Sequence, residues 1–255
     1  MTTLQGKTAL VTGASRGIGR ATAAALAEAG AHILAHYGRS EQDAESLVAA
    51  IRSQGGRAHA IRADLGTPEG ATLLAKEVRT IVGGRLDVLV LNAGISKAAR
   101  LADYTIEDFD NLFATNVRSP FFLVQQLLPI LGDGSNITVI SSIGAHAVVG
   151  KPGLDNPSLL AYSSTKGALE TLVKNWAAIL GPRGIRVNAV APGVIDTDMS
   201  NFTKTEAGRD TTLAMQALKR IGKPEDVADV VAFLASGAAR WITGASIPVD
   251  GGSKL

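Results

Sequence analysis

The chain has 255 residues, of which 46% are hydrophobic and 19% are charged, so it can bury a sizeable core and is not an intrinsically disordered protein. Its 25 basic and 23 acidic side chains leave a net charge of +2, which predicts neither a nucleic-acid partner nor an anionic membrane surface as partner. Cysteine is absent, which excludes disulfides, thiolate metal sites and a cysteine nucleophile. No apolar run approaches the ~18 residues of a membrane span, and the N-terminal residues do not resemble a signal peptide, so we expect a cytoplasmic protein.

Short aliphatic runs alternate with longer segments of helical period along the whole chain. Several runs are apolar at both alternating positions, which is typical of parallel strands covered by helices on both faces. The predicted strands are Lys7–Thr12, His32–His36, Arg57–Ile61, Leu86–Leu91, Asn136–Ser141, Ile185–Val190 and Ser246–Val249. The predicted helices are Ile18–Ala29, Glu41–Ser53, Pro68–Ile81 and Pro224–Leu234.

Such alternation predicts right-handed crossovers and an α/β fold of the doubly wound Rossmann type. The expected sheet is seven-stranded and mainly parallel, with helices on both faces. No repeat, linker or break in composition interrupts the pattern, so we expect residues 1–255 to form one domain.

A glycine-rich segment joins the first predicted strand to the helix that follows it. It contains Gly13, Ser15, Arg16, Gly17, Ile18 and Gly19. Glycine provides the φ freedom of a tight turn, a backbone without Cβ atoms can approach a pyrophosphate, and the helix N-terminus offers free N–H groups to the anion. An ordinary glycine-rich turn is the alternative, but the strand before it and the helix after it favour a dinucleotide site.

The residues that close the second strand indicate which dinucleotide binds. An acidic residue there would select NAD, because it can bind the ribose 2′-hydroxyl. Here Tyr37 occupies the strand end, and Gly38, Arg39 and Ser40 follow. Arg39 and Arg16 can both contact a 2′-phosphate, although both could also be solvated surface side chains. The sequence therefore favours NADP(H), with NAD(H) as the alternative.

Tyr162 and Lys166 lie four residues apart at the start of a segment with helical period, so both side chains lie on one helical face. Tyrosine titrates near pH ~10, which makes it too weak an acid for work at neutral pH. A neighbouring ammonium stabilises the phenolate and lowers the pKa of the phenol toward a useful range. Because such pairs also arise by chance, this pair alone does not establish an active site.

With its other motifs, the sequence resembles the short-chain dehydrogenase/reductase family over essentially its whole length. The motifs follow in the family's order: Thr12 to Gly19, Asp64-Leu65, Asn92-Ala93-Gly94, Asn116, Ser141-Ser142, Tyr162 to Lys166, Pro192-Gly193 and Val249 to Gly252. Their conjunction is far more specific than any one of them. The resemblance implies an NADP(H)-dependent oxidoreductase that acts on a carbonyl or secondary alcohol of a small molecule.

The resemblance also implies a role for each catalytic residue. Tyr162 is the general acid in reduction and the base in oxidation, and Lys166 lowers its pKa and binds the nicotinamide ribose. Ser142, rather than Ser141, orients the substrate oxygen, and Asn116 supports a water that connects Lys166 to solvent. Polar residues at strand ends can also serve the backbone alone, which is the alternative for Ser142 and Asn116.

Further residues are implied as cofactor contacts. Asp64 and Leu65 would border the adenine, and Asn92, Ala93 and Gly94 the adenosine side. After Pro192 and Gly193, the side chains of Ile195 and Thr197 would hold the carboxamide and fix the hydride face that is presented.

Two departures from the family pattern bear on the substrate. Twenty residues separate Ser142 from Tyr162, more than in many relatives, so a longer loop around Gly150–Pro157 is expected to reshape the pocket. In or near it, His146, Lys151 and Asp155 could touch substrate, or could simply be solvated. A 3-oxoacyl-carrier-protein reductase is the alternative function, and its acidic protein substrate needs a basic rim. No Lys or Arg lies between Arg118 and Lys151, so a small-molecule ketone or aldehyde is favoured.

For the assembly, the resemblance implies a homotetramer in which the Asn111–Leu131 and Tyr162–Leu180 helices pack across one two-fold axis and the last strand across another. The segment Met199–Arg220 is expected to be a mobile lid, with a surface helical hairpin as the alternative. The final Ser253-Lys254-Leu255 matches a peroxisomal address and leaves that compartment as the weaker alternative to the cytoplasm.

Two other site types receive less support. No metal is expected, because no ligand spacing is present among the four histidines: His32, His36, His59 and His146. A non-catalytic nucleotide-binding redox sensor is a rival function, but the intact set of Asn116, Ser142, Tyr162 and Lys166 favours an enzyme.

Overall fold

A computed structural model describes residues 3–149 and 153–253 of the chain. Within them, strands form one parallel sheet in the order β3-β2-β1-β4-β5-β6-β7. The strands are β1 (Thr8–Val11), β2 (His32–Tyr37), β3 (Ala58–Arg62), β4 (Leu86–Leu91), β5 (Leu131–Ile140), β6 (Arg186–Pro192) and β7 (Ser246–Val249). The chain moves outward from β1 toward β3 and then returns to β4 on the other side of β1. The predicted doubly wound Rossmann-type fold is confirmed.

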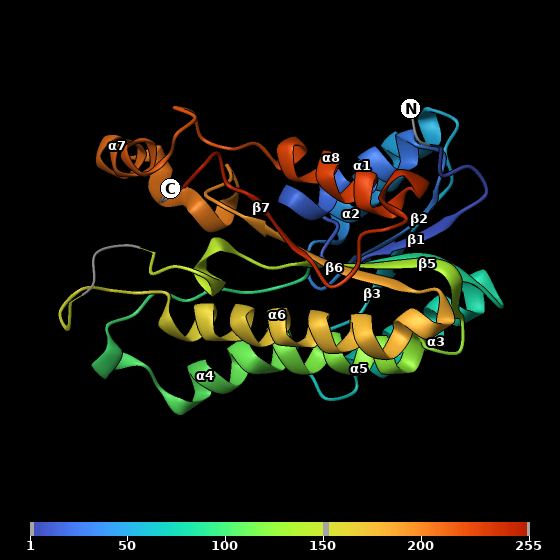
Figure 1. Cartoon of the computed structure of the whole chain (residues 1–255), viewed down its shortest axis with the longest axis horizontal. Coiled ribbons are helices and arrows are strands. Elements are labelled where there is room, and N and C mark those ends of the chain that lie inside the picture. Colours follow the sequence, from blue (N-terminus) through green and yellow to red (C-terminus); the bar gives the residue numbers. More distant parts are fainter. Residues whose placement is uncertain (1–2, 150–152, 254–255) are drawn as a thin grey trace.

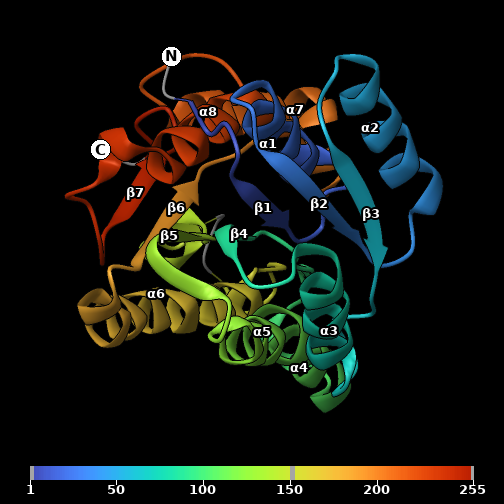
Figure 2. The same cartoon turned by 90° about the vertical axis from the view of Figure 1, so that its right-hand side faces the viewer.

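Helices cover both faces of the sheet. They are α1 (Gly17–Glu28), α2 (Glu41–Ser53), α3 (Gly70–Val82), α4 (Ile106–Phe113), α5 (Ser119–Leu127), α6 (Leu160–Leu180), α7 (Glu206–Met215) and α8 (Pro224–Ala235). In two perpendicular views, α1, α2 and α8 lie on one face and α3, α4, α5 and α6 on the other (Figures 1 and 2). No helix in the described ranges is both long and apolar enough to span a bilayer.

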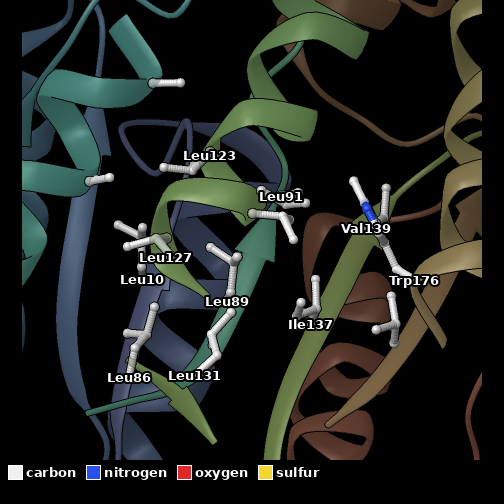
Figure 3. Close-up of a cluster of buried hydrophobic side chains, with 14 of the residues drawn as sticks. Leu10, Leu86, Leu89, Leu91, Leu123, Leu127, Leu131, Ile137, Val139 and Trp176 are labelled. Atoms are coloured by element: carbon white, nitrogen blue, oxygen red, sulfur yellow. The ribbon is translucent and has the colours of Figure 1, made fainter. Parts of the chain in front are cut away.

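Two apolar cores lie between the sheet and these helix layers. In β1, Leu10 points into the core beneath α3 and α5, whereas Ala9 and Val11 point into the core beneath α1 and α8. Successive side chains of a strand alternate between faces, so a strand that is covered on both sides must be apolar throughout. Figure 3 shows the first core, where Leu10 lies beside Leu127 of α5. This double burial explains the continuous apolar runs in the sequence.

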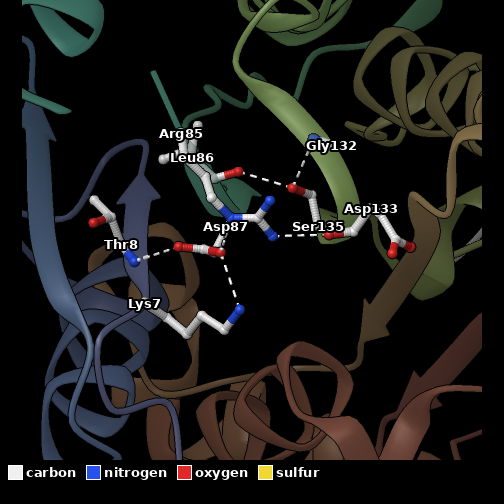
Figure 4. A network of polar contacts seen from close by, with 8 residues as sticks. All are labelled: Lys7, Thr8, Arg85, Leu86, Asp87, Gly132, Asp133 and Ser135. Atoms are coloured by element: carbon white, nitrogen blue, oxygen red, sulfur yellow. Dashed lines mark hydrogen bonds and ion pairs between the residues drawn. The ribbon is translucent and has the colours of Figure 1, made fainter. Parts of the chain in front are cut away.

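A polar network ties the strands together at their amino ends (Figure 4). The buried carboxylate of Asp87 accepts hydrogen bonds from Lys7 Nζ at 3.2 Å, Arg85 Nε at 2.7 Å and the Thr8 N–H at 3.0 Å. Burial alone would raise the pKa of Asp87, but these hydrogen bonds outweigh it and hold that pKa below its ordinary value. The network lies at the opposite edge of the sheet from the carboxyl ends of the strands.

Several predicted boundaries differ from the structure. The predicted helix Asn111–Leu131 ends at Leu127, and Leu131 is instead the first residue of β5. The predicted strand Asn136–Ser141 therefore starts five residues too late. A shift in register between β4 and β5 separates the pairing of Leu131 from the regular pairing that resumes at Asn136. In the sequence, the polar residues between these two positions resemble a turn. The predicted lid Met199–Arg220 begins within a short 3₁₀ segment (Asp198–Lys204), and α7 follows it.

A π turn at Ala114–Arg118 joins α4 to α5. The N–H of Ser119 bonds to the carbonyl of Ala114, five residues back. Pro120 follows directly, and in a regular α-helix its ring would clash with the carbonyl of Asn116. The wider turn relieves this clash, which is the physical reason why the predicted helix is not a regular α-helix.

Candidate active site

The predicted site residues gather at the carboxyl ends of β1, β4, β5 and β6. Open α/β sheets bind their ligands at this edge, where the strand order reverses. The segments that follow β5 and β6 and the first turn of α6 meet at the left-hand end of Figure 1. The structure therefore brings the glycine-rich segment and the Tyr162–Lys166 pair to one end of the molecule.

The glycine-rich segment forms the turn between β1 and α1. Gly13 and Gly17 have positive φ angles of 65° and 54°. A Cβ atom on Gly19 would overlap the Gly13 carbonyl oxygen and approach Asn92 Nδ2 to 2.5 Å. The N-cap residue Arg16 makes no side-chain hydrogen bond to the end of α1, and the first turn has no acidic residue. The N–H groups of this end can therefore receive an anion.

Asn92 and Thr12 fix the glycine turn to the end of β4. Asn92 Nδ2 donates to the carbonyls of Thr12 at 2.8 Å and Gly13 at 3.1 Å. Thr12 Oγ1 accepts from the N–H groups of Asn92 and Ala93 at 2.9 and 3.0 Å. Asn92 and Ala93 therefore hold the glycine turn against the end of β4. Gly94 brings the backbone close to Asn116 and Lys166.

The structure adds His36 to the site, which the sequence analysis did not single out. The buried imidazole accepts from the Gly13 N–H through Nδ1 at 3.0 Å, and its Nε2 lies 3.1 Å from the Ala63 carbonyl. One tautomer, with the hydrogen on Nε2, satisfies both contacts. Burial lowers the pKa of His36 to about 4, although the Ala63 carbonyl and Asp64 act in the other direction. His36 thus connects the glycine turn to the segment that carries Asp64.

This burial predicts a pH-dependent stability. An unfolded histidine titrates near pH ~6.5, so the unfolded chain binds a proton first as the pH falls. We expect His36 to remove about 3 kcal/mol of stability as the pH falls from about 6.5 to the folded pKa of about 4. Urea unfolding measured across this range tests it, with His36→Gln as the variant that cannot titrate. Parallel pH profiles for the two proteins would contradict the expectation.

The two arginines expected at the 2′-phosphate are exposed at the same edge. Arg16 Nη1 lies 3.0 Å from Asp198 Oδ2, an ion pair between two exposed side chains that joins the glycine turn to the segment after β6. Arg39 is exposed and follows β2, whose last residue, Tyr37, is buried. Ser40 is the N-cap of α2. A surface ion pair is weak, so an incoming phosphate can compete for Arg16.

Asp64 and Leu65 occupy different environments. Asp64 is exposed, and its Oδ1 accepts from the Gly66 N–H at 2.9 Å. Leu65 is 6% exposed, and its side chain belongs to the core beneath α3. The expected adenine contacts of Asp64 and Leu65 stay predictions.

The catalytic candidates Ser142, Tyr162 and Lys166 come together between β5 and α6. Burial raises the pKa of Tyr162 to about 12, and a hydrogen bond with Ser142 acts in the opposite direction. Ser142 Oγ also accepts from the Gly144 N–H at 3.1 Å. The neighbouring Ser141 is buried, and its Oγ has no hydrogen-bond partner among the described residues. This arrangement favours Ser142 over Ser141, as expected from the sequence.

Lys166 lies beside the Tyr162 ring, and its ammonium group bonds to the backbone of β5. Its Nζ lies 5.5 Å from the centroid of the Tyr162 ring and donates to the Ile140 carbonyl at 2.7 Å. Burial lowers the pKa of Lys166 to about 8, and Glu170 opposes this shift. Burial keeps the pKa of the phenol raised in this arrangement, and the lowering of that pKa by Lys166 stays a prediction.

Asn116, in the π turn, is 1% exposed, and its side-chain amide both accepts and donates hydrogen bonds. Its Oδ1 accepts from the Ile95 N–H at 2.9 Å, and its Nδ2 donates to the Ile95 carbonyl at 2.9 Å and to Thr165 Oγ1 at 3.0 Å. Because both amide hydrogens are used, Asn116 has none left to donate to a water. Its observed contacts connect the segment after β4 to α6.

Beyond β6, Pro192 ends the strand and Gly193 packs closely on the segment after β7. A Cβ atom on Gly193 would approach Asp250 Cα to 2.7 Å. Ile195 is buried, and the Thr197 side chain caps the 3₁₀ segment Asp198–Lys204 together with Ser200. Thr197 also lies against Gly17, so the expected carboxamide segment does adjoin the glycine turn.

Exposed apolar side chains lie on the segments that follow β4, β5 and β6 and at the first residue of α6, and we call six of them the apolar rim. They are Ile95, Val148, Leu154, Leu160, Met199 and Phe202. The backbones of Ala99 and Ser158 pair here at 2.8 and 3.1 Å, and the Tyr104 hydroxyl contacts the Lys97 and Ser158 carbonyls at 2.9 Å each. These contacts connect the segment after β4 to the longer loop before α6.

The longer loop only partly follows the sequence prediction. His146 contacts Glu170 and Ser246, and Asp155 is exposed. Lys151 lies outside the described residues. In the described ranges, no group of three His, Asp or Glu residues could hold a metal. His32 Nε2 and His59 Nδ1 do meet at 2.9 Å from adjacent strands, which sequence spacing did not indicate.

Comparisons with known proteins agree with this geometry. A family model described as enoyl-(acyl carrier protein) reductase matches residues 13–254. Versicolorin reductase 1 of Aspergillus parasiticus is 43% identical over 262 residues, covering 98% of this chain and 97% of that protein. The 3-oxoacyl-[acyl-carrier-protein] reductase of Staphylococcus epidermidis is 40% identical, covering 98% and 99%.

Solved structures are equally similar. A short-chain dehydrogenase from Burkholderia cenocepacia in complex with NADP has a TM-score of 0.92 and 39% identity, and the match covers 99% of both chains. The landomycin C-6 ketoreductase LanV with bound NADP and rabelomycin has a TM-score of 0.87 and 38% identity, and the match covers 100% of this chain and 98% of that one.

Proposed function

Because the chain belongs to the short-chain dehydrogenase/reductase family, we propose that it is an NADP(H)-dependent ketoreductase of an apolar small molecule. The observation that carries this proposal is the buried Tyr162–Lys166 pair beside Ser142, at the sheet edge that also carries the glycine turn. The NADP-bound structures of relatives support the choice of cofactor.

The residues present fit a dinucleotide phosphate. Gly19 leaves space that a Cβ atom would fill, and the uncapped end of α1 offers N–H groups to the pyrophosphate. Arg16 and Arg39 would bind the 2′-phosphate, and Asp64, Asn92, Ala93 and Gly94 would line the adenosine side. Ile195 and Thr197 would border the carboxamide. When bound, the nicotinamide supplies or accepts the hydride.

The protein's own part in reduction is to position the carbonyl and to supply a proton. With a pKa of about 12, Tyr162 keeps its proton at neutral pH and can donate it from Oη to the carbonyl oxygen. The Ser142 hydroxyl can donate a hydrogen bond to the same oxygen and stabilise its developing charge. The Lys166 ammonium stabilises the phenolate that remains after proton transfer. Because a phenol with so high a pKa is a weak acid, transfer of its proton depends on this stabilisation of the phenolate.

The apolar rim supports a carbon-rich substrate over a sugar or a charged thioester. The six side chains of the apolar rim are exposed on the segments that carry the site, and burial of such a surface favours an apolar ligand. A 3-oxoacyl-carrier-protein reductase is the second candidate, because a relative with that name is 40% identical to this chain.

Consumption of NADPH and of NADH should be compared over one substrate panel. It should include a polycyclic aromatic ketone, a short β-keto ester, a sugar and an acyl thioester on its carrier protein. We expect the highest kcat/KM with NADPH and the aromatic ketone. Highest activity on the carrier-protein thioester would instead establish the second candidate. NADH as the better donor would contradict the roles of Arg16 and Arg39.

We further propose that residues 1–255 form a single domain and that four copies assemble into a homotetramer. One sheet with continuous cores runs from β1 to β7, which supports the single domain. Phe121 and Phe122 of α5 and Ile179 of α6 are exposed, and a second copy would cover them. A monomer in sedimentation equilibrium would contradict the assembly. The cytoplasm is the proposed compartment. Two residues of the tripeptide that matches a peroxisomal address, Lys254 and Leu255, lie outside the described residues.

A further inference from the structure

A buried carboxylate lies one helical turn beyond Lys166. Glu170 of α6 is 7% exposed, and Lys166 four residues earlier is 4% exposed, so both groups are removed from water on the same face of the helix. The roles assigned above do not use this carboxylate. An ionised group in such a position is strongly destabilising unless partners compensate it, so its contacts need an explanation.

Two side chains from other elements contact Glu170. Ser246 Oγ of β7 donates to Glu170 Oε1 at 2.8 Å, and His146 Nε2 lies 3.2 Å from the same oxygen. Ser246 Oγ and His146 Nε2 are themselves 3.4 Å apart. His146 directly follows the short 3₁₀ turn Ile143–Ala145, whose N-cap is Ser142. The cluster therefore joins the segment of the catalytic serine to α6 and to the edge strand.

The surroundings of Lys166 leave its charge weakly supported without Glu170. Its Nζ bonds to a neutral group, the Ile140 carbonyl, and burial lowers its pKa to about 8. The Glu170 charge is the influence that raises this pKa. On α6 itself, Lys166 faces the Tyr162 phenol, and from other elements the segment at Gly94, beside the Asn116 amide of the π turn, lies close to its Nζ. His146 is the titratable group from outside α6 that contacts Glu170.

We propose that Glu170 is a positioning residue of the reaction: its carboxylate keeps Lys166 in the ammonium form and, through His146 and Ser246, holds the Ser142 segment against α6. The inference rests on the proposed function, because it concerns the lysine that stabilises the Tyr162 phenolate. It also assigns a task to His146, which the sequence left as a possible substrate contact.

The two tasks of Glu170 can be separated by substitution. Glu170→Gln keeps the shape and an acceptor for Ser246 but removes the charge. Glu170→Asp keeps the charge. Ser246→Ala and His146→Gln remove single contacts of the cluster and keep the carboxylate. Thermal unfolding first establishes that each variant is folded.

The readout is the alkaline limb of the pH profile of kcat/KM. Without the carboxylate, Lys166 loses its proton at lower pH, so we expect this limb to move down by about one pH unit or more in Glu170→Gln. At a pH above the new limb, activity should fall about tenfold. Glu170→Asp should restore the limb, and Ser246→Ala and His146→Gln should keep it while lowering kcat. An unmoved limb in Glu170→Gln, or an equal shift in Glu170→Asp, would overturn the proposal.

A second measurement does not depend on turnover. Lysine labelled with ¹³C at Cε can be titrated by NMR in the full chain, and the Lys166 signal is assigned from its absence in Lys166→Met. We expect the Lys166 midpoint to fall in Glu170→Gln and to return in Glu170→Asp. If the wild type turned over none of the panel substrates, the proposed function would fail, while this titration would still decide the inference about Glu170. An unchanged midpoint in Glu170→Gln would refute it.

Discussion

Replacing Tyr162 by Phe is expected to lower kcat about a thousandfold, because the proposed general acid of the site is removed. The ring is buried against the core and would keep its packing, and only the hydroxyl that bonds with Ser142 is lost. Cofactor binding should therefore change little. Single-turnover oxidation of NADPH measures the chemical step, and quenching of protein fluorescence by NADPH measures binding.

Tyr104→Phe is the matched control for this variant. It also deletes one phenolic hydroxyl, which here contacts the Lys97 and Ser158 carbonyls and lies outside the Ser142 cluster. We expect kcat to fall by no more than a few-fold in this control. If Tyr162→Phe kept more than about a tenth of the wild-type kcat, general acid catalysis by Tyr162 would be refuted.

Gly19→Ala is expected to weaken NADPH binding by about a hundredfold or more and to destabilise the fold by about 1–3 kcal/mol. The added methyl group would overlap the Gly13 carbonyl oxygen and press on Asn92 Nδ2 at 2.5 Å. Both neighbours are fixed, because Asn92 holds the Thr12 and Gly13 carbonyls. The turn must then move away from the end of α1, where the pyrophosphate would bind.

Gly167→Ala provides the comparison, because Gly167 is also inside a helix but has nothing within 4 Å of an added Cβ atom. Alanine favours the helix by about 1 kcal/mol over glycine, so this variant should be slightly more stable and bind NADPH normally. Isothermal titration with NADPH and urea unfolding test both variants. Equal affinities of Gly19→Ala and wild type would show that the turn does not cradle the cofactor.

Much of the fold follows from local patterns in the sequence. Ala9, Leu10 and Val11 are all apolar because they point alternately to the two faces of β1, and both faces are covered. This pattern alone predicts a parallel strand. The boundaries of α2 and β4 are predicted correctly. The start of β5 is not, because the pairing with β4 skips the residues between Leu131 and Asn136, and this register shift depends on the neighbouring strand.

The candidate site is predictable where the backbone conformation requires glycine or where two residues have a fixed helical spacing. Gly13, Gly17 and Gly19 mark a turn with positive φ or close approach, and the spacing of Tyr162 and Lys166 marks one helical face. His36 and Glu170 have no such local signal, because their partners lie on segments that are distant in the sequence. Nothing local indicates that His36 would meet Gly13, or that Glu170 would meet Ser246. The pKa directions of Tyr162 and Lys166 also depend on burial that only the tertiary structure defines.

The π turn at Ala114–Arg118 has a consequence for sequence alignment and for protein design. It inserts one residue into what would otherwise be a continuous helix, so α4 and α5 present their buried residues Leu112 and Leu123 in different phases. A design that replaced this turn by regular α-helix would improve the backbone geometry, but it would turn Asn116 away from Ile95 and Thr165. Deleting a single residue here would do the same, so alignments of relatives should treat the length of this segment as fixed even where its residues differ.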